Sequence, residues 1–182
     1  MKIMAVDPSL RATGVALPSG ETKLIEPAKM GPYSEGTDRV AAILWRVSTW
    51  MEEYKPTHIC LEDYAYGVGK SGRLFDIGEL GGCLKLLFLS RGLPIILVPP
   101  TVLKKFVTGK GNASKQEVMR DLKQKWGRSF VSSDMADAYA LRLLAMQKVG
   151  VRVEEGPGDR SVLGKVTILR SSEFLKTIAI KF

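Results

Sequence analysis

The order in which strand-like and helix-like segments follow one another restricts this chain to one class of fold. Short apolar runs that fit strands lie at 2–7, 13–17, 22–25, 58–62 and 93–98. The first three are closely spaced, which favours an antiparallel meander. Segments 37–54 and 76–90 carry apolar residues at helical spacing and separate the later runs, which favours parallel pairing. The pattern predicts an α/β fold with a mixed five-stranded sheet flanked by helices.

The C-terminal half of the chain is predicted to be helical at first and then to change character. Ser114 and Glu117 have the spacing of a capping box, and Ser132 with Ser133 can cap a helix over 134–147. After Gly150 the alternating stretches 166–169 and 177–180 indicate a hairpin or an added strand pair. We therefore expect one α/β domain over 1–149 and a C-terminal extension over 150–182 that packs on it or extends it.

Charge indicates an anionic partner. The chain has 182 residues and a net charge of +8, and its 45% hydrophobic content excludes overall disorder. Between 101 and 128 there are eight cationic residues and two acids, so this segment holds most of the excess charge. Charge runs are usually solvated faces, but one segment with this share of the charge favours contact with nucleic acid phosphates.

Several classes of protein are excluded by what the sequence lacks. Cys60 and Cys83 lie in apolar surroundings without metal-ligand spacing, so we expect reduced core thiols and a cytoplasmic protein. We expect no signal peptide, because no apolar segment precedes Asp7, and no run reaches the roughly 20 residues of a membrane span. With His58 as the single histidine, catalysis is expected to use carboxylates.

Acidic residues stand where two strands and a helix are expected to meet. Two strand-like runs end in acids, at Asp7 and at Glu62 with Asp63 beside it, and Asp134 and Asp137 share one helix face. Such acids are often only turn residues or helix-dipole partners. Four carboxylates at one point would instead need cations, and oxygen ligands select Mg²⁺ or Mn²⁺. Two such ions can promote phosphodiester hydrolysis. The pattern alone does not choose between Glu62 and Asp63.

Four segments together resemble the RuvC-type Holliday junction resolvases of the ribonuclease H-like superfamily. They are MAVDPSLRATGVAL at 4–17, ICLEDYAYG at 59–67, KKFVTGKGNASKQEV at 104–118 and SSDMADAYALRLLA at 132–145. The stretch VTGKGNASK is the most specific of them. The similarity covers roughly 1–147, and it leaves open whether the chain is a cellular or a viral (phage) member of the family.

The resemblance implies an active site and a reaction. It implies that Asp7, Glu62, Asp134 and Asp137 bind two Mg²⁺ ions, replaceable by Mn²⁺, and so selects Glu62 over Asp63. It also implies that Lys115 acts beside the scissile phosphate, with Lys104 or Lys105 as a second basic residue. The expected enzyme is an endodeoxyribonuclease of DNA recombination and repair.

The resemblance also implies partners. Expected DNA contacts are Lys104, Lys105, Lys110 and Lys115, the basic loop residues Lys70 and Arg73, and a base-stacking tyrosine, Tyr64 or Tyr66. The substrate is branched DNA: four-way junctions, with forks, flaps and Y-junctions also open. The implied homodimer suits a two-fold junction, and helix 76–90, with Leu80, Leu84, Leu87 and Phe88, is either part of its interface or buried within the monomer.

Two other functions use the same type of fold. A junction-binding protein without catalysis would be expected to lack one or more of the four acids, and all four are present. An ATPase of the ribonuclease H-like type would need a second glycine-rich phosphate hairpin, which the sequence does not contain.

Overall fold

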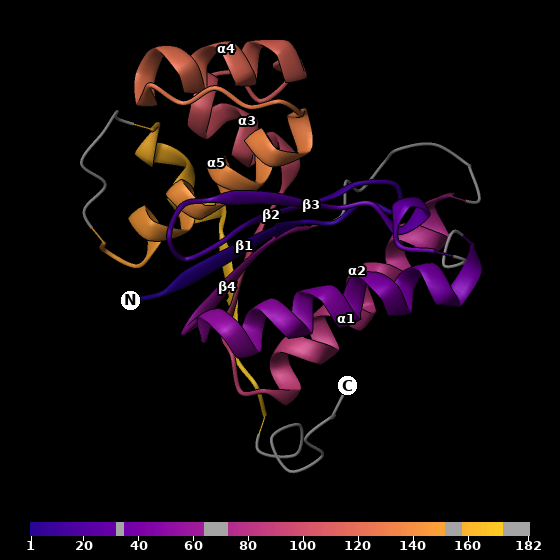
Figure 1. The fold of residues 1–182 in the computed structure, drawn as a ribbon. Coiled ribbons are helices and arrows are strands. Elements are labelled where there is room, and N and C mark those ends of the chain that lie inside the picture. Colours follow the sequence, from indigo (N-terminus) through magenta and orange to yellow (C-terminus); the bar gives the residue numbers. More distant parts are fainter. Residues whose placement is uncertain (32–34, 64–72, 152–157, 173–182) are drawn as a thin grey trace.

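One mixed sheet organises the molecule (Figure 1). The computed structural model describes residues 1–31, 35–63, 73–151 and 158–172. The strands are β1 (Ile3–Asp7), β2 (Thr13–Ala16), β3 (Thr22–Ile25), β4 (His58–Glu62), β5 (Ile95–Val98) and β6 (Thr167–Leu169). They lie in the order β3-β2-β1-β4-β5-β6. The first three pair antiparallel, and β4 and β5 continue parallel to β1, as predicted.

Helices cover both faces of the sheet. They are α1 (Gly36–Tyr54), α2 (Arg73–Ser90), α3 (Pro100–Thr108), α4 (Lys115–Trp126) and α5 (Ser133–Lys148), with short 3₁₀ helices η1 (Pro27–Lys29) and η2 (Arg160–Lys165). Figure 1 shows α3, α4 and α5 on one face and α1 and α2 on the other. Alternate β1 residues serve the two cores: Ile3 and Ala5 face α3–α5, while Met4 and Val6 face α1 and α2.

The described sheet has six strands, so the prediction of five was wrong by one. Residues 167–169 pair antiparallel with β5, with Ile96 opposite Ile168. Without β6 the edge of β5 would expose unpaired backbone groups. The predicted strand at 166–169 is thus an added edge strand, whereas its expected partner at 177–180 lies outside the described residues.

The segment before β6 packs against α3. The amide of Asp159 donates to the carbonyl of Phe106 at 2.9 Å, and Lys148 Nζ donates to the carbonyl of Leu163 at 2.8 Å. A Cβ on Gly158 would lie 2.0 Å from the Phe106 ring, so only glycine permits this approach. Val162 completes the contact as a buried core residue.

Helix α2 uses its leucines inside the monomer. The residues predicted to lie either at a dimer interface or inside the monomer are fully buried against α1 and the sheet: Leu80, Leu84, Leu87 and Phe88. They therefore belong to the core of the monomer. In the described part of the chain, no helix has the length and apolar content needed to cross a membrane.

Candidate active site

The four acids predicted from the sequence line one pocket of about 300 Å³. Asp7 is the last residue of β1 and Glu62 the last residue of β4, and these strands are parallel neighbours in the sheet. Asp134 and Asp137 come from the first turns of α5. Parallel strands end at the same edge, which explains how residues 55 positions apart in the sequence meet.

Helix α5 reaches this edge because β2 has a glycine where the two come closest. Gly14 pairs with Asp7 across the sheet. A Cβ at Gly14 would lie 2.0 Å from the backbone oxygen of Asp134 and 3.3 Å from the Ala138 Cβ. The small residues at 14 and 138 therefore let the helix approach the sheet and bring its two aspartates to the strand ends. The Ser132 cap, which accepts from the Met135 amide, sets where α5 begins.

The turn after Asp7 is held by a threonine that sequence reasoning did not select. Thr13 is fully buried, and its Oγ1 donates to the Ser9 carbonyl at 2.6 Å and accepts from the Ser9 amide at 3.2 Å. These bonds hold the Pro8–Ser9 segment, which lines the pocket, beside Asp7. The signal was present in the segment DPSLRATG, where a threonine and a glycine follow the strand-end acid.

Glu62 and its neighbour Asp63 have different surroundings. Glu62 lines the acidic pocket, whereas Asp63 forms an ion pair with Lys85 of α2, with Nζ and Oδ1 3.1 Å apart. The Asp63 amide also donates to the Val98 carbonyl at 2.9 Å. The choice of Glu62, which the resemblance implied, therefore agrees with the positions of the two side chains.

Burial is the main cause of raised pKa values in the acidic pocket. It raises the pKa of Asp7 well above the ordinary range, and the charges of Glu62 and Asp137 add to it. Burial is also the largest cause for Glu62, whose pKa rises to about 7, and for Asp137, whose pKa rises to about 6. A side-chain hydrogen bond with Glu62 also raises the pKa of Asp7, so this buried pair of carboxyl groups favours holding a proton. Burial and mutual repulsion thus make ionisation of these carboxylates costly.

Two lysines enter the same pocket from other elements. Lys115, the first residue of α4, places Nζ 3.4 Å from Asp134 Oδ1 and 3.2 Å from Ser133 Oγ. Burial acts to lower the pKa of Lys115, but Asp134 and Asp137 outweigh it and the net shift is upward. Lys104 of α3 lines the pocket as well. Both lysines favour the ionised forms of Glu62 and Asp137.

The donor set fits divalent cations, although the side chains are not yet arranged around one. Carboxylate oxygens are the ligands that Mg²⁺ and Mn²⁺ prefer. Among the residues with described positions, no three metal-ligating side chains already form a metal site. Asp7 instead shares its hydrogen bond with Glu62. This is expected of buried carboxylates that repel each other without a cation between them.

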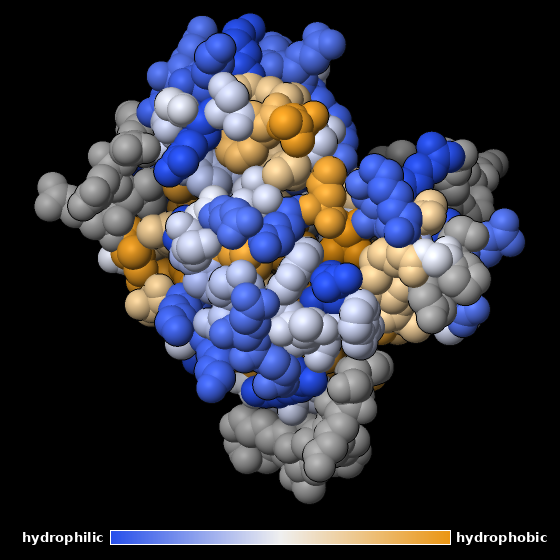
Figure 2. Space-filling view, viewed as in Figure 1, coloured by the Kyte–Doolittle hydropathy of each residue, from blue (hydrophilic) through white to orange (hydrophobic). Residues whose placement is uncertain are grey.

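The predicted DNA contacts are brought together only in part. Lys104 and Lys115 line the acidic pocket, Lys110 is exposed just after α3, and Lys105 lies in the last turn of α3. Figure 2 shows hydrophilic residues over the outer surface at the top of the view, where α4 lies. Tyr64, Tyr66 and Lys70 lie outside the described residues, and Arg73 begins α2 with its side chain outside the description.

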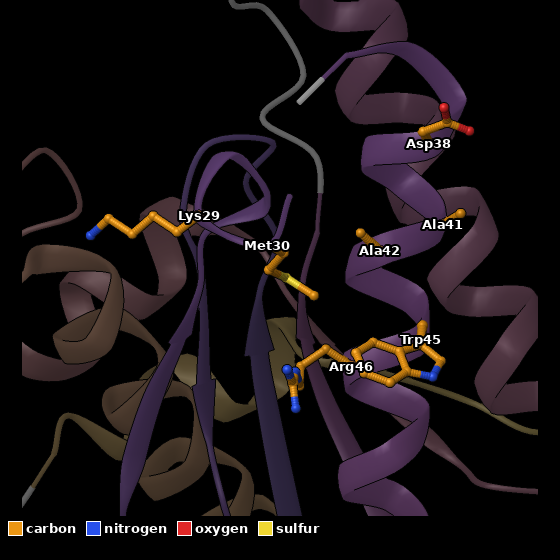
Figure 3. A pocket seen from close by; sticks show the side chains of 7 residues that line it. All are labelled: Lys29, Met30, Asp38, Ala41, Ala42, Trp45 and Arg46. Carbon is orange, nitrogen blue, oxygen red and sulfur yellow. The ribbon is translucent and has the colours of Figure 1, made fainter. Parts of the chain in front are cut away.

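Another pocket, larger than the acidic one, holds no part of this acidic cluster. It lies between η1 and α1 with a volume of about 600 Å³, and its lining includes Met30, Trp45 and Arg46 (Figure 3). The Arg46 guanidinium lies 4.7 Å from the centre of the half-exposed Trp45 ring. The single acid in its lining, Asp38, gives it no means to hold a metal cluster.

The sheet order and the helices on both faces define the ribonuclease H-like class of fold that the sequence predicted. A family model described as crossover junction endodeoxyribonuclease RuvC matches residues 3–144. The chain therefore belongs to the RuvC family of crossover junction endodeoxyribonucleases.

Individual relatives agree with this family. The RuvC of Corynebacterium glutamicum is 28% identical over 149 residues, which cover 78% of this chain and 67% of the relative. The structure of Thermus thermophilus RuvC has a TM-score of 0.64 at 20% identity, covering 86% of this chain and 99% of that one. A structure of the same Thermus protein in complex with a Holliday junction substrate has a TM-score of 0.63 at 20% identity and covers 85% and 98% of the two chains.

Proposed function

We propose that this chain is a divalent-metal-dependent endonuclease that resolves four-way DNA junctions by hydrolysing phosphodiester bonds. The observation that carries the proposal is the convergence of Asp7, Glu62, Asp134 and Asp137 in one pocket with Lys104 and Lys115. Membership of the RuvC family supports the same reaction, and the junction bound to the Thermus relative supports branched DNA as the substrate.

The four carboxylates are the proposed ligands of two Mg²⁺ ions, which Mn²⁺ can replace. Bound there, the metal would activate water and stabilise the leaving oxygen of a phosphodiester. Asp7 and Glu62 would give up their shared proton on binding, because ionised carboxylates are the better ligands. Burial would then favour metal binding, since the attraction between a cation and carboxylates is stronger when the carboxylates are shielded from water.

Lys115 is the proposed electrostatic partner of the reacting phosphate. It is held toward the acids by Ser133 and Asp134, and its raised pKa keeps it protonated. A cation placed beside the phosphoryl oxygens stabilises charge that develops in the transition state. Lys104 of α3 lines the same pocket and has the same proposed task. Lys105 and Lys110 are proposed backbone contacts outside the pocket.

A homodimer is proposed, with the exposed stripe of α2 as part of its interface. The stripe consists of the exposed residues Phe75, Gly82 and Leu86 and the half-buried Gly78, which recur at helical spacing. Phe75 is 83% exposed and Leu86 is 44% exposed. A Cβ added at Gly78 or Gly82 would meet open space. An apolar stripe with small residues at its middle suits an isologous contact between two copies of this helix.

Residues 1–149 form the proposed nuclease unit, and the part from 150 onward is proposed as an extension of it. The family match, which ends at 144, supports this division. The contacts of Asp159, Val162 and β6 with α3 and β5 support an extension that packs on the nuclease unit rather than a separate domain.

The test is cleavage of synthetic DNA by the purified protein in Mg²⁺, Mn²⁺ or EDTA. We expect paired cuts in a four-way junction with either metal and none in EDTA. Fork, flap and duplex substrates of matched sequence define the breadth of substrates. Binding of the junction without any cleavage in either metal would contradict the proposal and favour a junction-binding protein without catalysis.

A further inference from the structure

A second pocket, the arginine pocket, adjoins the acidic pocket. Its volume is about 280 Å³, and its lining comes from the turn after β1 and from the beginnings of α1 and α2. The lining residues are Ser9, Leu10, Arg11, Arg39, Asp76 and Ile77. Ser9 and Ile77 also line the acidic pocket, so a ligand can extend from one into the other.

The two arginines of this pocket have no anionic partner in the described part of the chain. Arg39 is half-buried, and its Nε is fully buried without a hydrogen-bond acceptor among the described residues. Arg11 is exposed. The ion pairs found within the described ranges include neither arginine, although Asp76 lines the same pocket. A buried donor without an acceptor is costly, and an incoming anion would supply that acceptor.

The backbone that carries Arg11 is held relative to the catalytic acid. Ser9 Oγ accepts from the amides of Arg11 and Ala12, each at 3.4 Å. Thr13 Oγ1 closes the same turn by donating to the Ser9 carbonyl. Asp7 and Arg11 are therefore the two ends of one hydrogen-bonded turn, and each end lines its own pocket.

We propose that Arg11 and Arg39 bind a backbone phosphate next to the scissile phosphate on the strand that is cut. The inference rests on the proposed function, because it takes the acidic pocket as the place of the scissile phosphate. A guanidinium matches two phosphate oxygens with two parallel N–H donors. Two arginines against the single carboxylate of Asp76 leave the arginine pocket cationic.

This contact would orient the cut strand rather than read its sequence. Phosphate contacts set register and direction, whereas base edges carry sequence information. A phosphate held at the turn after β1 would restrict how the neighbouring phosphodiester enters the acidic pocket, since the two pockets share Ser9. Arg11 and Arg39 are thus positioning residues in the proposed reaction.

The test pairs one protein change with one phosphate change. Single methylphosphonates, which remove the charge of one phosphate, are placed in turn along the cut strand of a junction. Affinity is measured in EDTA for the wild type, Arg39→Gln and Arg11→Gln. We expect the wild type to lose about ten-fold in affinity at one phosphate beside the scissile one. Each arginine variant should bind the unmodified junction more weakly and lose less than the wild type at that position, because only one arginine then still contacts the phosphate.

Arg46→Gln is the matched control. It removes the same charge from the same helix, but Arg46 lies against Trp45 in the pocket between η1 and α1 (Figure 3). Its loss at each methylphosphonate should equal that of the wild type. Melting temperatures of all variants should stay close to the wild-type value, since neither Arg11 nor Arg39 has a described ion pair to lose.

Three results would overturn the inference. Arg39→Gln and Arg11→Gln with the wild-type sensitivity at every phosphate would show that neither arginine contacts the strand. A lower melting temperature with unchanged affinity would show that Arg39 is structural and pairs with Asp76. If the wild type does not cut junctions in Mg²⁺ or Mn²⁺, the proposed function fails and this inference fails with it. If the wild type cuts junctions but the arginine changes do not alter its sensitivity to any methylphosphonate, only this inference fails.

Discussion

At the scale of single residues, the site depends on acids that folding alone does not favour. Desolvation raises the pKa values of Asp7, Glu62 and Asp137, so each of these side chains resists ionisation where it stands. A chain gains nothing in stability from such a cluster. A cation bound among these acids would offset the free-energy cost of burying them, because the same desolvation strengthens the attraction between the cation and the carboxylates.

Asp7→Asn should abolish cleavage and leave junction affinity equal to the wild type or higher. The change removes a proposed metal ligand and, with it, repulsion between the acidic pocket and phosphates. Mg²⁺ should raise the melting temperature of the wild type and have a smaller effect on this variant, which differential scanning fluorimetry measures. The control is Asp63→Asn, because Asp63 pairs with Lys85 outside the pocket. Full-rate cutting by Asp7→Asn, or loss of cutting by Asp63→Asn, would contradict the assignment.

Lys115→Ala should slow cleavage more than it weakens binding. Its Nζ lies beside Asp134 in the acidic pocket, so its charge stands where the phosphate is proposed to react. We expect a loss of about 10²-fold or more in the single-turnover rate. Lys123→Ala is the control, since Lys123 is an exposed residue late in α4 and should affect only binding at low salt. Equal effects of the two changes on rate and affinity would make Lys115 an ordinary backbone contact.

At the scale of elements, the approach of α5 to the sheet decides whether four acids become one site. Gly14→Ala places a methyl group against the Asp134 backbone, so α5 must move. We expect a loss of about 1–3 kcal/mol in the free energy of unfolding. Cleavage should fall more than this loss explains, because the aspartates are displaced from Asp7. Gly164→Ala is the control, since a Cβ there meets open space. Wild-type activity in Gly14→Ala would refute this account of the site.

The elements that the sequence predicted well are those with clear boundaries. Strands 22–25 and 58–62 were predicted with the bounds that the structure has, because turn residues and acids delimit their apolar runs. The strand-like run at 93–98 is followed by Pro99 and Pro100, and proline interrupts the regular hydrogen bonding of a strand. In the structure Pro99 is the N-cap of α3 and Pro100 its first residue, a position that proline suits. Helix α3, which carries Lys104, was therefore not predicted as an element.

The pairing of strands and the buried side of each helix were harder to predict than the elements themselves. Strand β6 has three residues, and nothing in so short a run specifies that it pairs with β5. Helix α2 is apolar around most of its circumference, so periodicity did not separate its buried leucines from the exposed stripe of Phe75 and Leu86. Arg11 and Arg39 stand 28 positions apart, and only the fold brings them to one pocket.

At the scale of the whole molecule, one chain contributes one acidic pocket, while a four-way junction offers two equivalent strands. Productive resolution therefore needs two copies in a definite relation, which an isologous dimer provides. Helix α2 begins beside the acidic pocket, since Ile77 contributes to the lining of that pocket. A dimer built on the stripe of α2 would therefore connect the two acidic pockets through this helix of each copy.

Gly82→Glu should convert a dimer of this chain into a monomer without harming the fold. A Cβ at position 82 meets open space in the monomer, and glutamate favours helix over glycine, so the melting temperature should not fall. Two charges facing each other across the two-fold axis would oppose association. Light scattering should give twice the chain mass for the wild type and a single mass for the variant, which should also lose paired cuts. Gln124→Glu, on exposed α4, carries the same charge and should stay dimeric. A wild type that is monomeric both free and on junction DNA would refute the dimer, and a Gly82→Glu variant that remains dimeric would place the interface elsewhere than α2.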